Sequence, residues 1–240
     1  MARKHDLRAQ RAGTVINMTS KKQESDLGRA LADAVNRITD GFGVALEHTA
    51  QWKLTDIVSS LRGDFDDIDF HCHFETSAMK PDGGILSMLD NDLTARPILI
   101  TEVKNQGTND LRLAEGKPRQ AKGNAIERLG KNVIGFRTAM MSEAIVPFVC
   151  FGYGCDFADD SSILDRVSTI AMFGPLNTIS VVNQGESGSF NRGSFFFREQ
   201  KWSVGEMADV MYDVASRAIH YYFARYGEAA FRSSSRMRSE

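Results

Sequence analysis

The chain has 240 residues, of which 42% are apolar and 25% charged, a mixture typical of a folded globular protein rather than a disordered, fibrous or disulfide-rich one. Its 29 Lys and Arg residues nearly balance 31 Asp and Glu residues, and the net charge of −2 argues against a protein that simply coats nucleic acid. No apolar run reaches the length of a membrane-spanning helix, and the three cysteines show no repeated spacing, which indicates reduced thiols. We therefore expect a soluble, intracellular protein.

The first half of the chain contains two helical patterns followed by a predicted hairpin. Apolar residues at three- and four-residue spacing predict helices over Leu27–Ile38 and Leu54–Leu61. Gly83–Leu89 and Pro97–Lys104 are strand patterns, and a polar turn that begins at Asn91 would join them as a hairpin. The segment before the first strand would then lie close to the end of the second.

The second half alternates helices with strands. In chain order we predict a helix, a buried strand, a helix, two short strands and a final helix over Asn124–Ser142, Val146–Tyr153, Ile163–Met172, Thr178–Val182, Ser194–Arg198 and Val204–Tyr226. The last helix carries an apolar stripe that indicates core or a subunit interface, formed by Met207, Met211, Val214, Ala218, Tyr222 and Phe223. Strands interleaved with helices predict an α/β fold.

Charge is distributed unevenly along this near-neutral chain. Residues 1–22 contain six basic side chains against one acid, a local charge of +5, and residues 112–137 also carry +5. Between them, residues 54–92 contain nine acids against two basic side chains, a local charge of −7. An acidic cluster beside basic segments suits an enzyme that uses a metal on a polyanion, although solvated surfaces also carry mixed charge.

Polar and basic composition at both ends predicts a three-part organisation. Residues 1–24 are expected to form a basic, mobile N-terminal arm, and residues 232–240 a flexible tail. Residues 25–231 would form one α/β domain with a central mixed sheet flanked by helices.

The most informative chemistry lies in the motifs KPDGG and TEVK. Side chains alternate along a strand, so Glu102 and Lys104 would emerge on one face while Val103 points into the core. Asp82, at the start of the partner strand, could approach them. Two carboxylates suit Mg²⁺, and an adjacent ammonium could offset charge that builds up on a phosphate during phosphodiester hydrolysis. A surface strand that ends in a salt-bridged Glu and Lys is the ordinary alternative.

A second motif, GNAIER, follows a basic run that includes Lys117 and begins a predicted helix. Asn124 could pair with an adenine edge in the major groove, and Arg128 offers a rigid fork of donors for purine edges or phosphate. The ordinary alternative is a helix start at which Asn124 acts as the cap.

Taken together and in this order, KPDGG, TEVKNQG and GNAIER resemble the EcoRI-type restriction endonucleases of the PD-(D/E)xK nuclease superfamily. The likeness covers about residues 50–226, with further matches in the segments FVCFGYGCDF and ILDRVSTIAMFGPLN. It implies a restriction-endonuclease-like fold and a homodimer that cuts both strands of a short DNA palindrome with Mg²⁺, leaving 5′-phosphates.

The resemblance also implies roles for individual residues. Asp82 and Glu102 would be catalytic metal ligands, with the Val103 carbonyl as a possible third ligand, and Lys104 would be the catalytic lysine. DNA would be contacted by Lys117, Asn124, Ala125, Glu127, Arg128 and Arg166. The basic arm is similar in character to the family's arms that wrap DNA.

The expected target has a central AATT, with GAATTC as the first choice and CAATTG or AATT alone as alternatives. A cognate DNA methyltransferase in the same bacterial host and a cytoplasmic location follow from the same resemblance. Two other functions remain open at this stage. One is a structure-specific repair or recombination nuclease on the same fold, and the other is a catalytically inactive DNA-binding protein.

Overall fold

A mixed five-stranded sheet forms the centre of the computed structural model, which describes residues 15–105, 116, 123–159, 161–165, 167, 175–182 and 192–232. Its strands lie in the order β1–β4–β5–β6–β7, with bounds Leu46–Thr49, Ile85–Leu89, Ala95–Asn105, Phe148–Tyr153 and Ser194–Arg198. β1, β4 and β5 pair antiparallel, whereas β5, β6 and β7 pair parallel. The predicted hairpin and the α/β fold with a central mixed sheet are confirmed.

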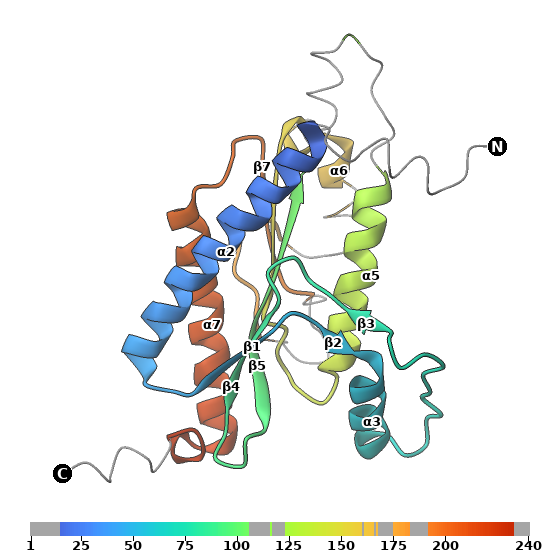
Figure 1. Ribbon diagram of the computed structural model, residues 1–240, viewed down its shortest axis with the longest axis vertical. Coiled ribbons are helices and arrows are strands. Elements are labelled where there is room, and N and C mark those ends of the chain that lie inside the picture. The colour runs from blue at the N-terminus through green and yellow to red at the C-terminus, as the bar shows by residue number, and fades with distance from the viewer. Residues whose placement is uncertain are drawn as a thin grey trace.

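Helices cover both faces of this sheet. α2 (Val15–Phe42) and α7 (Val204–Tyr226) lie together on one side, and α5 (Gly123–Ala139) lies on the other (Figure 1). A strand covered on both faces needs apolar side chains in both directions, which explains the almost continuous apolar sequence of β6. The shorter elements are β2 (Trp52–Lys53), α3 (Leu54–Asp64), β3 (Ala78–Met79), η1 (Cys155–Phe157), α6 (Ser162–Asp165) and η3 (Glu228–Ala230).

The last helix, α7, begins and packs as its sequence predicts. The Ser203 hydroxyl accepts a hydrogen bond from the backbone N–H of Glu206 at 3.2 Å, and the Glu206 carboxylate accepts one from the Ser203 N–H at 2.9 Å. This capping box satisfies two donors that the helix would otherwise leave free. The predicted stripe lies in the core, with Phe223 partly buried and the other five side chains buried.

The first described helix, α2, starts at Val15, well before the predicted start at Leu27. Residues 19–26 (TSKKQESD) contain no apolar side chain, so hydrophobic periodicity does not extend the predicted helix back beyond Leu27. Residues 15–24, which were expected to belong to a mobile arm, are therefore helical, and Gln23 is buried. Residues 1–14 and 233–240 lie outside the described residues, and the division into arm, domain and tail stays a prediction.

The predicted strand over Thr178–Val182 is wrong. The segment has one isolated bridge, from Val182 to Ile145, because its backbone bonds go to different neighbours: the Val146 N–H donates to the Val181 carbonyl, and the Ser180 N–H donates to the Ser194 hydroxyl. Of the helix predicted over Ile163–Met172, only the start lies in α6, and most of the remainder lies outside the described residues.

Two further expectations concern membranes and cysteines. Among the described helices, none is both long and apolar enough to cross a membrane. Cys72 is partly exposed and Cys150 is buried, and both are free thiols.

Asp26 joins α2 to the segment before α7. Its carboxylate accepts hydrogen bonds from Lys201 Nζ at 2.6 Å and Arg29 Nη2 at 2.5 Å, and these bonds lower the pKa of Asp26. A lowered pKa in the folded state stabilises the fold above the unfolded-state pKa, and this contribution is lost as the pH falls through the folded-state pKa. The Asp26 carboxylate therefore stabilises the protein at neutral pH but not in acid.

We expect Asp26→Asn to lower the free energy of unfolding by about 1 kcal/mol near neutral pH, because both cationic partners are largely exposed. The difference from wild type should become smaller at a second, acidic pH below the ordinary Asp value of 3.8, as the pH falls through the lowered folded-state pKa. Urea denaturation at both pH values measures it, with the exposed Asp33→Asn in the same helix as the control. An equal loss at both pH values would contradict the electrostatic explanation.

Candidate active site

The side chains predicted from the KPDGG and TEVK motifs come together beside the β4–β5 hairpin. β5 places Glu102 and Lys104 on one face, and Val103 between them lies in the core. Asp82 lies in the turn just before β4 and faces the same two residues. The hairpin register, with Ile85 opposite Ile100, therefore brings a residue twenty positions earlier in the chain next to Glu102.

Asp82, Glu102 and Lys104 all contact one another. Lys104 Nζ is hydrogen-bonded to Glu102 Oε1 and lies 3.5 Å from Asp82 Oδ2. The Asp82 N–H donates to Glu102 Oε2 at 3.1 Å, and the Val103 N–H donates to Asp82 Oδ2 at 3.1 Å. Each carboxylate is thus held by a backbone N–H as well as by the shared ammonium, which fixes its orientation.

The turn that carries Asp82 depends on two glycines. Gly84 has φ +77°, a conformation that favours glycine, and a Cβ at Gly83 would overlap the Thr101 hydroxyl. The His48 Nε2 lies 2.9 Å from the Gly83 carbonyl, as a donor would. Sequence reasoning missed His48, because its place beside the turn follows from the pairing of β1 with β4.

α5 adds a fourth polar side chain that sequence reasoning also missed. Asn132 Nδ2 donates to Glu102 Oε1 at 3.1 Å. Asn132 lies in the helix between the apolar positions Leu129, Val133 and Phe136, which are all fully buried. A polar residue within the sheet-facing side of a helix is the sequence signal that could have indicated it.

The proximity of these charges shifts their pKa values. Burial raises the pKa of Glu102 above its ordinary value, and the Lys104 ammonium opposes this rise. Burial lowers the pKa of Lys104, but attraction to Glu102 and Asp82 outweighs it, so the net pKa of Lys104 is raised. Burial also raises the pKa of the neighbouring Cys150 thiol, which therefore adds no charge to the site at neutral pH.

The donor set fits a hard divalent cation. Asp82 and Glu102 both approach the Lys104 ammonium, so one cation between them could contact both carboxylates. Mg²⁺ prefers such oxygen ligands and often binds one or two carboxylates together with substrate phosphate and water. Among the residues that the structure describes, no group of three or more His, Cys, Asp or Glu could hold a metal ion.

The predicted DNA-reading residues lie at the start of α5 or beyond the described part of the chain. Gly123–Ala139 is helical, as the GNAIER motif predicted, so Asn124, Ala125, Glu127 and Arg128 occupy its first turns. Their side chains, like Lys117 and Arg166 as a whole, lie outside the described residues. The structure therefore places the helix but does not describe the side chains that are predicted to read DNA.

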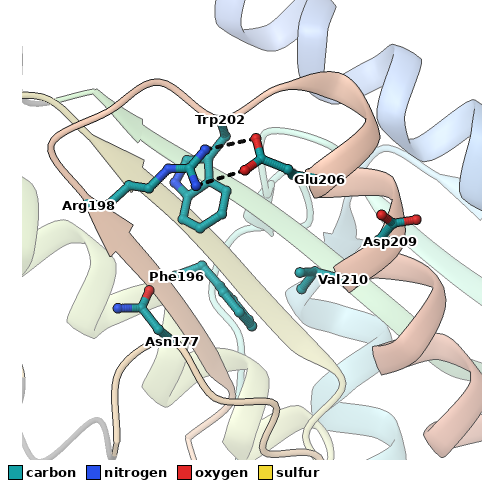
Figure 2. A pocket seen from close by; sticks show the side chains of 7 residues that line it. All are labelled: Asn177, Phe196, Arg198, Trp202, Glu206, Asp209 and Val210. Carbon is teal, nitrogen blue, oxygen red and sulfur yellow. Dashed lines mark hydrogen bonds and ion pairs between the residues drawn. The ribbon is translucent and has the colours of Figure 1, made fainter.

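A separate groove of about 470 Å³ lies at the start of α7 (Figure 2). The Arg198 guanidinium lies 3.6 Å from the centre of the Trp202 ring and makes two hydrogen bonds of 2.8 Å with Glu206. Asp209 pairs with Arg37 of α2. These charged groups bind each other and hold α7 in place. The groove is lined by Asn177, Phe196, Arg198, Trp202, Glu206, Asp209 and Val210.

The mixed sheet with flanking helices is that of a restriction-endonuclease-like α/β fold. Comparison with known families agrees: the model of the restriction endonuclease EcoRI family matches residues 9–163. The chain therefore belongs to the EcoRI family of restriction endonucleases.

Two relatives indicate how far the likeness extends. The type II restriction enzyme RsrI of Cereibacter sphaeroides is 33% identical over 179 residues, which cover 60% of this chain and 64% of RsrI. The type II restriction enzyme EcoRI of Escherichia coli is 26% identical over 202 residues, which cover 70% of this chain and 73% of EcoRI. The alignment with RsrI thus spans less than two thirds of that enzyme.

Proposed function

We propose that this chain is a type II site-specific deoxyribonuclease that hydrolyses phosphodiester bonds in double-stranded DNA with Mg²⁺. The observation that carries the proposal is the convergence of Asp82, Glu102 and Lys104 at the hairpin in a member of the EcoRI family. An ordinary surface salt bridge would not need a second carboxylate held by backbone N–H groups at the same point.

In this proposal Asp82 and Glu102 would hold the cation, with the Val103 carbonyl as a third ligand. When bound, Mg²⁺ supplies Lewis acidity and positive charge at the scissile phosphate. Lys104 directs its ammonium toward the phosphate oxygens and offsets the negative charge that builds up on them. A water oxygen forms the new bond to phosphorus, the bond to the 3′ oxygen breaks, and that oxygen leaves as a hydroxyl after gaining a proton. The products therefore carry 5′-phosphate ends.

The proposed target sequence rests on the family resemblance of the residues at the start of α5. Asn124, Ala125, Glu127 and Arg128 would read a central AATT, with Lys117 and Arg166 as further DNA contacts, and GAATTC is the first choice of site. A palindrome is read symmetrically by a two-fold dimer, so we infer a homodimer. An enzyme of this kind would act in the bacterial cytoplasm beside a methyltransferase that protects the host's own sites.

Digestion of a fully sequenced phage DNA tests the function directly. With Mg²⁺ we expect discrete fragments whose sequenced ends share AATT and carry 5′-phosphates, and with EDTA we expect no cleavage. A smear, or cleavage only at branched junctions, would instead support a structure-specific nuclease. Specific binding without cleavage in any divalent metal would indicate a catalytically inactive DNA-binding protein.

A further inference from the structure

The hydrogen bond from Asn132 to Glu102 connects two parts of the molecule that have different tasks in the proposed function. Its donor, Asn132 Nδ2, belongs to α5, and its acceptor, Glu102 Oε1, belongs to β5, at a distance of 3.1 Å. Glu102 is only 1% exposed, so this contact is made in the interior. The bond therefore joins the helix that begins with GNAIER to a carboxylate of the candidate active site.

The packing of α5 against the sheet fixes the position of Asn132. Phe136, one turn further along α5, stacks on Phe148 of β6 with ring centres 5.7 Å apart, and it also contacts Trp52 of β2. A Cβ at Gly135 would overlap the Met79 sulfur, so β3 approaches the helix as closely as glycine allows. A shift of α5 along the sheet would consequently move the Asn132 amide relative to Glu102.

The proposed reading residues lie directly before this contact. Arg128 is four positions before Asn132 in one continuous helix, which places the two Cα atoms on the same face about 6 Å apart along the axis. A force applied to the first turns of α5 by DNA therefore reaches Asn132 through helical backbone and not through a flexible loop.

The hydrogen bond from Asn132 would help to hold Glu102 in place when Lys104 turns toward DNA. Glu102 Oε1 accepts hydrogen bonds from both Lys104 and Asn132. If the Lys104 ammonium turns toward a phosphate, as the proposed function requires, Asn132 still holds this oxygen. Glu102 Oε2 keeps its bond from the Asp82 N–H in either case. The carboxylate can then keep one orientation while the lysine changes partner.

We propose that Asn132 is a positioning residue that makes the orientation of the metal-binding carboxylate Glu102 depend on how α5 is seated on the DNA. The inference rests on the proposed nuclease function. It adds a direct structural link between the recognition of the DNA sequence by α5 and the binding of metal by Glu102. Outer-shell donors to metal-binding carboxylates commonly affect metal affinity or activity by 10- to 100-fold.

The test compares Asn132→Leu, which keeps approximate size but removes the donor, with Asn132→Asp, which places a second negative charge against Glu102. Thr138→Ala serves as the control, because Thr138 is half-buried on the same helix and its hydroxyl donates to the Ile134 carbonyl of that helix. Three quantities are measured for each protein: the Kd for a cognate duplex in EDTA, the Mn²⁺ affinity of the enzyme–DNA complex by calorimetry, and the single-turnover cleavage rate on cognate and single-mismatch sites.

For Asn132→Leu we expect an unchanged Kd in EDTA, a Mn²⁺ affinity about tenfold weaker and a cognate cleavage rate about 10- to 100-fold lower. Asn132→Asp should lower the cleavage rate further. The ratio of the cleavage rate on cognate sites to the rate on mismatched sites should fall in both variants. Without the Asn132 amide, correct placement of α5 on cognate DNA can no longer orient Glu102 and so no longer raises the cognate rate. Thr138→Ala should match wild type throughout.

The inference would be overturned if Asn132→Leu bound Mn²⁺ as tightly as wild type and kept the wild-type preference for cognate sites. If Asn132→Leu instead bound DNA more weakly than wild type in EDTA, Asn132 would be a DNA contact. Should the leucine variant fail to fold, Asn132→Ser removes the same bond with a smaller side chain. If wild type binds Mn²⁺ and DNA but does not cleave, the proposed function fails while the calorimetric comparison still decides the role of Asn132.

Discussion

Lys104→Ala is expected to lower the rate of DNA cleavage by about 100- to 1000-fold, which is the usual cost of removing one group that stabilises transition-state charge. The Lys104 ammonium is the positive charge that both candidate metal ligands contact, and its raised pKa keeps it protonated at neutral pH. The neighbouring Val103 points into the core and offers no charge in its place. A single-turnover assay with saturating Mg²⁺ measures the loss.

The binding of cognate DNA separates a catalytic role of Lys104 from a structural one. In EDTA, Lys104→Ala should keep most of its specific affinity, because the proposed base contacts lie on α5. Lys53→Ala removes the same charge from an exposed position on β2 and should cleave at the wild-type rate. Wild-type cleavage by Lys104→Ala would refute the assignment of Lys104.

The helices and strands that the sequence predicted well are those in which apolar side chains recur at a regular spacing along the whole element. α7 matches its predicted bounds because its apolar stripe spans the whole helix, and the hairpin follows from two apolar runs around a polar turn. Three strands are too short and too polar to show a regular spacing of apolar residues: Leu46–Thr49, Trp52–Lys53 and Ala78–Met79. They form because neighbouring strands offer them hydrogen-bond partners, which a local pattern cannot reveal.

The same distinction applies to the candidate site. Alternation along β5 and one hairpin were enough to predict that Asp82, Glu102 and Lys104 come together. Asn132 and His48 reach the site through the packing of α5 and the pairing of β1, and both are decided by tertiary structure. Sequence therefore indicated the groups with evident chemistry and missed the groups that hold them in place.

Glu102→Gln is expected to abolish most cleavage while tightening DNA binding in the absence of metal. The substitution keeps the shape of the side chain but removes one charge from the proposed metal ligands, so we expect cleavage to fall by about 1000-fold or more, at the upper end of single-group effects. Removing a negative charge a few ångströms from phosphate should raise the metal-free affinity about tenfold, or ~1.4 kcal/mol. Filter binding in EDTA and single-turnover cleavage measure the two effects.

The hydrogen bonds around Glu102 explain why the amide cannot restore the site. One carboxylate oxygen accepts from Lys104 and Asn132, and the other accepts from the Asp82 N–H. A glutamine whose NH₂ group takes the place of Oε1 leaves both Lys104 and Asn132 without this acceptor, and one whose NH₂ group takes the place of Oε2 leaves the Asp82 N–H without it. Glu47→Gln, at an exposed position on β1, changes net charge equally and should alter neither cleavage nor affinity.

A comparison with Asp82→Asn sharpens the electrostatic part of this prediction. The Asp82 side chain is 31% exposed and the Glu102 side chain only 2%, so water and salt screen the field of Asp82 more effectively. If both carboxylates lie near the scissile phosphate, Glu102→Gln should therefore tighten metal-free binding more than Asp82→Asn, and the difference should persist at higher salt. Weaker binding by Glu102→Gln than by wild type would show that this carboxylate does not face DNA phosphate, and with that the proposed active site would be in the wrong place.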